Sequence, residues 1–200
     1  MRSIKLFLVI IICSVLSSIS VTAKEPVDGY IFIGDSRTVG MDIAVSDDVQ
    51  EEYHISFVAK VGAGYKWLTK EVVQEVNRIM SEDTEVDNWL IITNFGVNDL
   101  RNATKYCEYY RELLEDEWSD VTLYYLSVNP VDESKCNTVC NTDIEAFNEL
   151  FCEELNYINT YTGLLGNIDS KDGLHYSNKV NYAIYNEVIN QIEELRYCEG

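Results

Sequence analysis

The sequence predicts an α/β fold, a three-layer α/β/α sandwich around a mostly parallel sheet of five strands. Short apolar runs alternate along the chain with segments in which apolar residues recur every three or four positions. The runs are apolar at consecutive positions, which is typical of strands that are covered by helices on both faces. Strands that alternate with helices in this way lie parallel and are joined by right-handed crossovers.

The expected strands are four apolar runs and a fifth, weaker one. They are residues 30–34, 54–62, 89–96, 121–128 and, the weakest, 156–161.

Three amphipathic patterns predict helices, which begin near Leu68, Ile144 and Val180 and continue to residues 80, 155 and 195. Thr142 with Glu145 predicts a capping box at the second helix, and Ser177 predicts the N-cap of the third.

The first 23 residues predict a secretory signal peptide. Two basic residues precede an apolar run from Leu6 to Leu16, and small residues end the segment at Ala23. The run is shorter than the roughly 20 residues of a membrane-spanning helix. We therefore expect a secreted protein, with residues 24–200 forming a single domain and no stable membrane insertion after cleavage.

Charge narrows the range of partners. Without the leader, 13 basic residues face 34 acidic ones, a formal charge of −21. Such a field repels phosphate backbones and anionic surfaces, so it argues against nucleic acid, anionic lipid and strongly acidic polymers as partners and favours small neutral molecules or neutral carbohydrates. The sequence indicates no oligomeric state.

Five cysteines follow the leader, and an extracellular location permits disulfides between them. Cys136 and Cys140 lie close together in a loop and form the expected local pair, although other pairings stay open. The Cys-x₃-Cys spacing has no histidine nearby, so no metal or other cofactor is predicted.

Polar residues follow the expected strands: Ser36 after the first, Gly62 and Gly64 after the second, and Asn98 with Asp99 after the third. In parallel sheets ligands bind beyond the carboxyl ends of the strands, so these residues are expected to share one crevice.

Ser36 could serve as a nucleophile if a base and an orienting acid lie beside it. Of the two histidines, His54 begins a strand, where a structural hydrogen bond is its expected role. His175 lies in a loop before the last helix, three residues after Asp172 and with Gly173 between them. The carboxylate can therefore fold back onto Nδ1 while Nε2 points toward the serine.

An oxyanion that forms on the substrate would need hydrogen-bond donors. The candidates are the backbone N–H of Ser36, a glycine N–H from "VGAG" and the side-chain amide of Asn98.

Four blocks carry these residues: "GDSR", "VGAG", "GVND" and "DGLH". In this order they resemble the SGNH/GDSL hydrolase family, and the resemblance spans residues 30–188. It implies Ser36 as nucleophile, His175 as general base, Asp172 as its orienting acid, and Ser36, Gly64 and Asn98 as the oxyanion hole. The second block lacks the asparagine that is frequent there, which leaves Gly62 as the alternative to Gly64.

Neighbouring residues have less specific expected roles. Arg37 replaces the usual leucine of the first block and is expected to pair with an acidic group, with binding of a substrate carboxylate or sulfate as the alternative. Asp35 and Asp99 are expected to support their loops, Asn129 is a candidate for lining the crevice, and Trp67 is expected to pack in the core or to stack on a sugar.

The leading functional hypothesis is a secreted serine esterase that removes short acyl groups, most simply acetyl, from carbohydrate or other small neutral esters. An O-acyltransferase with the same triad and a noncatalytic carbohydrate-binding or adhesion module are the alternatives.

Overall fold

The computed structural model describes residues 26–153, 156–166 and 168–199. Five strands form one parallel sheet in the order β2-β1-β3-β4-β5. They are β1 (Asp28–Gly34), β2 (Ile55–Ala59), β3 (Asn88–Asn94), β4 (Thr122–Leu126) and β5 (Asn156–Ile158). The α/β prediction is confirmed, and the predicted leader, 1–23, lies outside the described residues.

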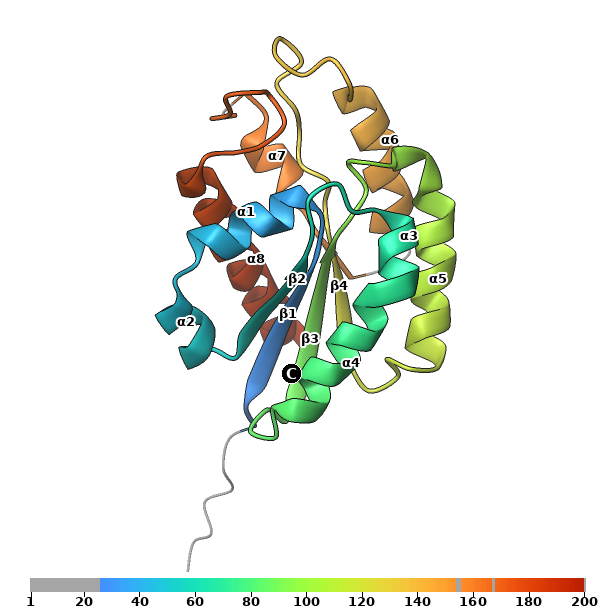
Figure 1. Cartoon of the computed structure of the whole chain (residues 1–200), viewed down its shortest axis with the longest axis vertical. Coiled ribbons are helices and arrows are strands. Elements are labelled where there is room, and N and C mark those ends of the chain that lie inside the picture. The colour runs from blue at the N-terminus through green and yellow to red at the C-terminus, as the bar shows by residue number, and fades with distance from the viewer. Residues whose placement is uncertain (1–25, 154–155, 167, 200) are drawn as a thin grey trace, which may run out of the picture.

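One face of the sheet is covered by a helical segment after β2 and by two further helices, on the right in Figure 1. The segment consists of α3 (Tyr65–Trp67), the π-helical η1 (Leu68–Val72) and α4 (Val73–Glu82). The others are α5 (Ala103–Glu115), which follows the 3₁₀ turn η2 (Leu100–Asn102), and α6 (Asn141–Cys152). Ile31 and Ile33 of β1 point into this layer and are fully buried.

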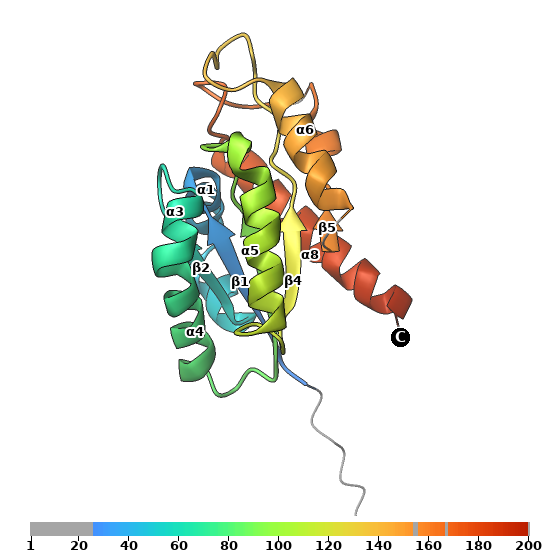
Figure 2. The ribbon, with the colours of Figure 1, turned by 90° about the vertical axis from the view of Figure 1, so that its right-hand side faces the viewer.

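The opposite face is covered mainly by α1 (Ser36–Ala44) and α8 (Asn178–Glu199), and Figure 2 shows the sheet between the two layers. Phe32 of β1, between the two isoleucines, packs here because successive strand residues point to opposite faces. The short helices α2 (Asp47–Glu52) and α7 (Tyr161–Leu164) complete the chain. Within the part of the chain that the structure describes, no helix has the length and apolarity to cross a membrane.

The strand order creates a site at the centre of the sheet. After β1 the chain continues into α1 on one face, whereas after β3 it continues into α5 on the other. Diverging connections of this kind leave a crevice beyond the carboxyl ends of the two strands. Gly34 at the end of β1 pairs with Ala59 and Asn94, so the loops after β1, β2 and β3 begin side by side.

The predicted capping box at Thr142 was wrong, whereas Ser177 occupies the predicted N-cap position but makes no side-chain hydrogen bond within the described ranges. Helix α6 begins at Asn141, so Thr142 lies within its first turn, and the distant Glu133 accepts the Asn141 N–H at 2.9 Å instead. Ser177 directly precedes α8, but its buried hydroxyl has no hydrogen-bond partner among the described residues. Its carbonyl accepts the N–H of Asn181 at 2.9 Å, so the helix starts there without a side-chain cap.

Candidate active site

Ser36 is the first residue of α1 and lies directly beyond β1. Asp35 is the N-cap of this helix, and its carboxylate accepts the Arg37 N–H at 3.0 Å. Gly34 permits the tight exit from the strand, because a Cβ there would lie 2.0 Å from Thr38 Oγ1. The turn therefore leaves the serine partly exposed at the mouth of the crevice while its neighbours are buried.

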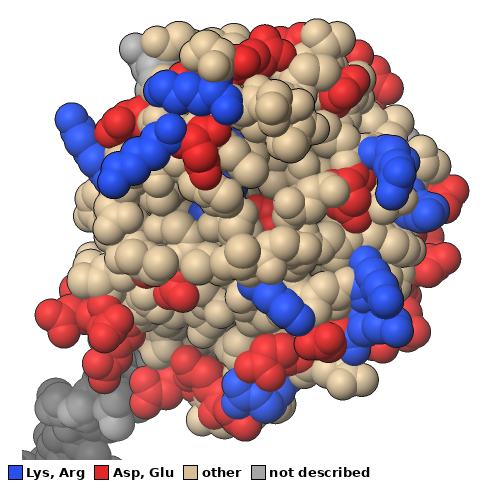
Figure 3. Space-filling view, turned by 45° about the horizontal axis from the view of Figure 1, so that its top comes forward, with Lys and Arg blue, Asp and Glu red and all other residues tan. Residues whose placement is uncertain are grey.

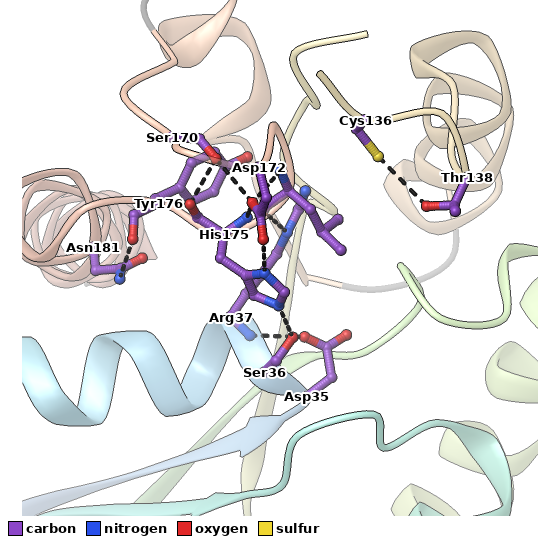
Figure 4. Close-up of polar contacts among 11 residues, drawn as sticks. Asp35, Ser36, Arg37, Cys136, Thr138, Ser170, Asp172, His175, Tyr176 and Asn181 are labelled. Carbon is purple, nitrogen blue, oxygen red and sulfur yellow. Dashed lines mark hydrogen bonds and ion pairs between the residues drawn. The ribbon is translucent and has the colours of Figure 1, made fainter. Parts of the chain in front are cut away.

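The structure brings Ser36, His175 and Asp172 together (Figure 4). His175 Nε2 lies 3.0 Å from Ser36 Oγ, and His175 Nδ1 lies 2.7 Å from Asp172 Oδ2. The hydrogen bond from His175 is the largest cause that holds the pKa of Asp172 well below its usual range. The ionised carboxylate keeps a proton on Nδ1, which leaves Nε2 free to accept the serine proton.

A tight turn holds the histidine and the aspartate. Asp172 Oδ1 accepts the N–H groups of Leu174 and His175 at 2.9 and 2.8 Å. Gly173 between them has φ +80°, a conformation that favours glycine. A Cβ at Gly173 would also lie 2.6 Å from the Asp132 carbonyl oxygen, so no larger residue fits.

The loop after β2 carries Gly64, and the loop after β3 fixes its position. Asp99 accepts the Tyr65 N–H at 2.9 Å and the Tyr106 hydroxyl at 2.8 Å. Gly64 is required by this close approach, because a Cβ there would lie 2.7 Å from Asp99 Oδ2. Asp99 thus joins the two loops.

The side chain of Asn98 makes a hydrogen bond to the loop after β2 that the sequence did not predict. Its side-chain amide donates to the Ala63 carbonyl oxygen at 2.8 Å. An amide nitrogen carries two hydrogens, so one of them stays available to a ligand. Gly62, the alternative to Gly64, has φ +72° and open space where a Cβ would lie, so the turn conformation itself explains the glycine.

Asp35 is almost completely buried beside the serine, with an exposed fraction of 1%. Burial disfavours its charged form and raises the pKa of the carboxyl to about 6, an effect that the Arg37 N–H and guanidinium oppose.

The expectation for Arg37 was wrong. Its side chain is buried and donates to three backbone carbonyl oxygens, at distances of 2.5 Å to Asn129, 3.2 Å to Leu174 and 3.5 Å to Pro130. The guanidinium also lies 5.0 Å from the ring centroid of Tyr176. Arg37 therefore fastens the loop of the histidine to the helix of the serine, a role that its position after Ser36 did not reveal.

Two other residues lie away from the crevice surface. Asn129 is buried, and its side-chain oxygen accepts the Thr160 hydroxyl at 2.7 Å, so it does not line the crevice as expected. His54 lies just before β2 with φ +49° and Nδ1 2.8 Å from Asp83 Oδ2, the structural hydrogen bond that was predicted.

The expected Cys136–Cys140 pair is not formed in this structure, where both residues are thiols. Cys136 is buried, and its sulfur lies 3.5 Å from the Thr138 hydroxyl. The disulfide stays a prediction from the extracellular assignment rather than a feature of the described fold.

No family model matches the sequence, and no curated protein matches it. The structure, however, is similar to solved structures that share the SGNH/GDSL hydrolase fold, and this chain has that fold as well. A GDSL-like lipase from Bacteroides thetaiotaomicron is 18% identical, with a TM-score of 0.59 over 85% of this chain and 89% of that one.

Two further structures are similar to the chain. The catalytic domain of Streptococcus pneumoniae peptidoglycan O-acetyltransferase A is 14% identical, with a TM-score of 0.58 over 86% of this chain and 96% of that one. A two-domain esterase active on acetylated mannans is 13% identical, with a TM-score of 0.51 over 85% of this chain and 50% of that one.

Proposed function

We propose that this protein is a serine esterase that removes short acyl groups, most simply acetyl, from carbohydrate esters. One observation carries the proposal: an unbroken series of hydrogen bonds joins Asp172, His175 and Ser36, at 2.7 and 3.0 Å. The similar structures named as lipase and mannan esterase support ester bonds as the target.

In the first half of the reaction, Ser36 Oγ attacks the ester carbonyl carbon and its proton moves to His175 Nε2. We expect the N–H groups of Ser36 and Gly64 and the remaining amide hydrogen of Asn98 to donate to the oxyanion. The protonated imidazole, stabilised by Asp172, then gives the proton to the departing alcohol. The acyl group stays on Ser36 as an ester.

In the second half, water attacks the acyl-enzyme while His175 accepts a proton from it. Collapse of the second tetrahedral intermediate releases the carboxylic acid and returns the proton to Ser36 Oγ. Short acyl groups are favoured because the site is open to solvent: the side chains of His175 and Asp172 are 46% and 56% exposed.

The proposal is tested by the hydrolysis of p-nitrophenyl acetate and p-nitrophenyl octanoate. We expect the acetate to be preferred, and Ser36→Ala to lower kcat by roughly 10³-fold or more. Ser46→Ala is the matched control, because Ser46 is exposed and its side chain caps no helix. Equal activity of the two variants would refute the role of Ser36, and a preference for octanoate would refute the acyl specificity.

An O-acyltransferase is the second candidate, since the similar Streptococcus pneumoniae domain is named for acetyl transfer. In that case a sugar hydroxyl replaces water in the second half-reaction. Incubation of the protein with p-nitrophenyl acetate and an acceptor oligosaccharide separates the two activities: acetylated sugar indicates transfer and free acetate indicates hydrolysis. If neither product forms, the noncatalytic binding module becomes the better explanation.

Secretion is part of the proposal and is supported by the sequence of residues 1–23. N-terminal sequencing of the exported protein should begin at Lys24. A mature protein that keeps the apolar run would contradict removal of the leader.

A further inference from the structure

We propose that the cavity beside Gly64 and Asn98 binds an anionic group on the sugar, so that the substrate is an acyl ester of an acidic saccharide. This inference rests on the proposed esterase function and specifies its substrate class. The cavity has a volume of about 430 Å³ and extends from these two residues to α3 and η1.

Three lysines line this cavity: Lys60, Lys66 and Lys70. They are three of only 15 basic residues in a chain with a formal charge of −19. All three are exposed, and within the described part of the chain no carboxylate forms an ion pair with any of them. Figure 3, which brings the top of Figure 1 forward, shows blue side chains standing among the red ones at this end of the molecule.

The carboxylates in the cavity already have partners. Glu71 accepts the indole N–H of Trp67 at 2.9 Å, and Asp99 is held by the loop contacts described above. The lining carries three lysines against these two carboxylates, a formal charge of 3 − 2 = +1 in an acidic protein. Charges are screened beyond about 8 Å at physiological salt, so these lysines outweigh the distant acidic surface for a ligand in the cavity.

Trp67 supplies a surface for the sugar ring. It is partly exposed, lines the cavity and has its indole N–H fixed by Glu71. Lys60 Nζ lies 5.6 Å from the centroid of its ring. An indole ring with an ammonium group over it offers apolar surface and positive charge together, which suits a sugar that carries a negative substituent.

The cavity adjoins the proposed reaction centre. Gly64 and Asn98, two of the expected oxyanion donors, are also among its lining residues. A substrate with its acyl group at Ser36 would thus place a neighbouring part of the saccharide among the lysines. Lysine binds as a point charge rather than as a planar fork, so a carboxylate, a sulfate or a phosphate would satisfy the site. This differs from the neutral substrate that the net charge predicted.

Hydrolysis of matched acetyl esters tests the inference: an acetylated neutral oligomannose, an acetylated oligogalacturonate and an acetylated sulfated oligosaccharide. We expect kcat/KM to be highest for an acidic substrate. Changing Lys60, Lys66 and Lys70 together to glutamine should lower it about tenfold, mainly through KM, and should lower the ratio of kcat/KM for the acidic ester to kcat/KM for the neutral oligomannose ester by about the same factor. The acidic substrate with the higher kcat/KM, the oligogalacturonate or the sulfated oligosaccharide, identifies the anionic group.

Arg78→Gln is the control, because it removes one positive charge from α4, where Arg78 is exposed and paired with Glu75 and Glu82. It should leave the preference for acidic substrates unchanged. As a second readout, unacetylated oligogalacturonate should inhibit p-nitrophenyl acetate hydrolysis competitively, and the triple lysine variant should be inhibited about tenfold more weakly.

The experiments distinguish failure of the anionic subsite from failure of the esterase proposal. An active protein that shows no preference for acidic esters, or a preference that survives in the triple variant, overturns the anionic subsite and leaves the esterase proposal standing. A folded protein without activity on any ester, p-nitrophenyl acetate included, overturns the esterase proposal and this inference with it.

Discussion

Replacing Asp35 with asparagine should stabilise the protein, and should do so more at pH 8 than at pH 4.5. Asparagine has the same size, and its side-chain oxygen can accept the Arg37 N–H that Asp35 accepts now, so the cap of α1 is kept. What the substitution removes is a negative charge in a site that is 99% inaccessible to solvent. Because burial raises the pKa of Asp35, ionisation of this group favours the unfolded chain.

The magnitude follows from the two pKa values of Asp35, its usual 3.8 and about 6 in the folded protein. Below the lower pKa value Asp35 is protonated in both the folded and the unfolded state, so its ionisation costs no stability. Between the two values the folded state binds more protons than the unfolded state, so the free energy of unfolding falls as pH rises. The cost reaches about 1 kcal/mol at pH 4.5 and about 3 kcal/mol at pH 8.

Urea denaturation of the wild type and the Asp35→Asn variant measures this difference. With a slope of about 2 kcal/mol per molar urea, the variant's midpoint should rise by about 0.5 M at pH 4.5 and by about 1.5 M at pH 8. A pH-independent effect of the substitution moves both midpoints equally, so the increase of about 1 M between the two pH values is the test. A difference between variant and wild type that stays constant or shrinks toward pH 8 would refute the reasoning.

Three further substitutions test the site. Asp172→Asn should lower kcat for p-nitrophenyl acetate by roughly 10³–10⁴-fold through loss of the correct imidazole tautomer, with an unchanged circular dichroism spectrum; unchanged kcat would exclude the orienting role. Arg37→Met leaves three carbonyl oxygens without their donor and should lower the free energy of unfolding in urea by roughly 3–5 kcal/mol; wild-type stability would contradict the loop-fastening role. Gly64→Ala, which displaces Asp99, should lower kcat/KM at least about tenfold. Gly163→Ala, with no neighbour near its Cβ, is its control and should be silent.

The sheet was predictable because its strands are buried on both faces. Runs such as 89–96 are apolar at consecutive positions, and β3 occupies most of that range. Helix α5 was not anticipated because its buried face combines Tyr106 and Tyr110 with Cys107 and Leu113. Tyrosine and cysteine give a weak apolar signal, although here they pack in the core.

The site was predictable where local sequence determines it. The turn from Asp172 to His175 is closed by hydrogen bonds within four residues, and Gly173 marks it in the sequence. Arg37 was not predictable, because the carbonyl oxygens it binds lie 92 to 137 residues away. The lysines around Trp67 were also missed, because net charge averages over a surface and does not reveal which charges share a cavity.

The central claim, that the histidine makes the Ser36 hydroxyl a nucleophile, is tested most directly by mapping a fluorophosphonate adduct. The folded protein is labelled, digested and analysed by mass spectrometry, with a His175→Gln variant in parallel. The adduct should be on Ser36, and the variant should react at least about 10²-fold more slowly. Labelling at another residue, or equal rates for the two proteins, would contradict the claim.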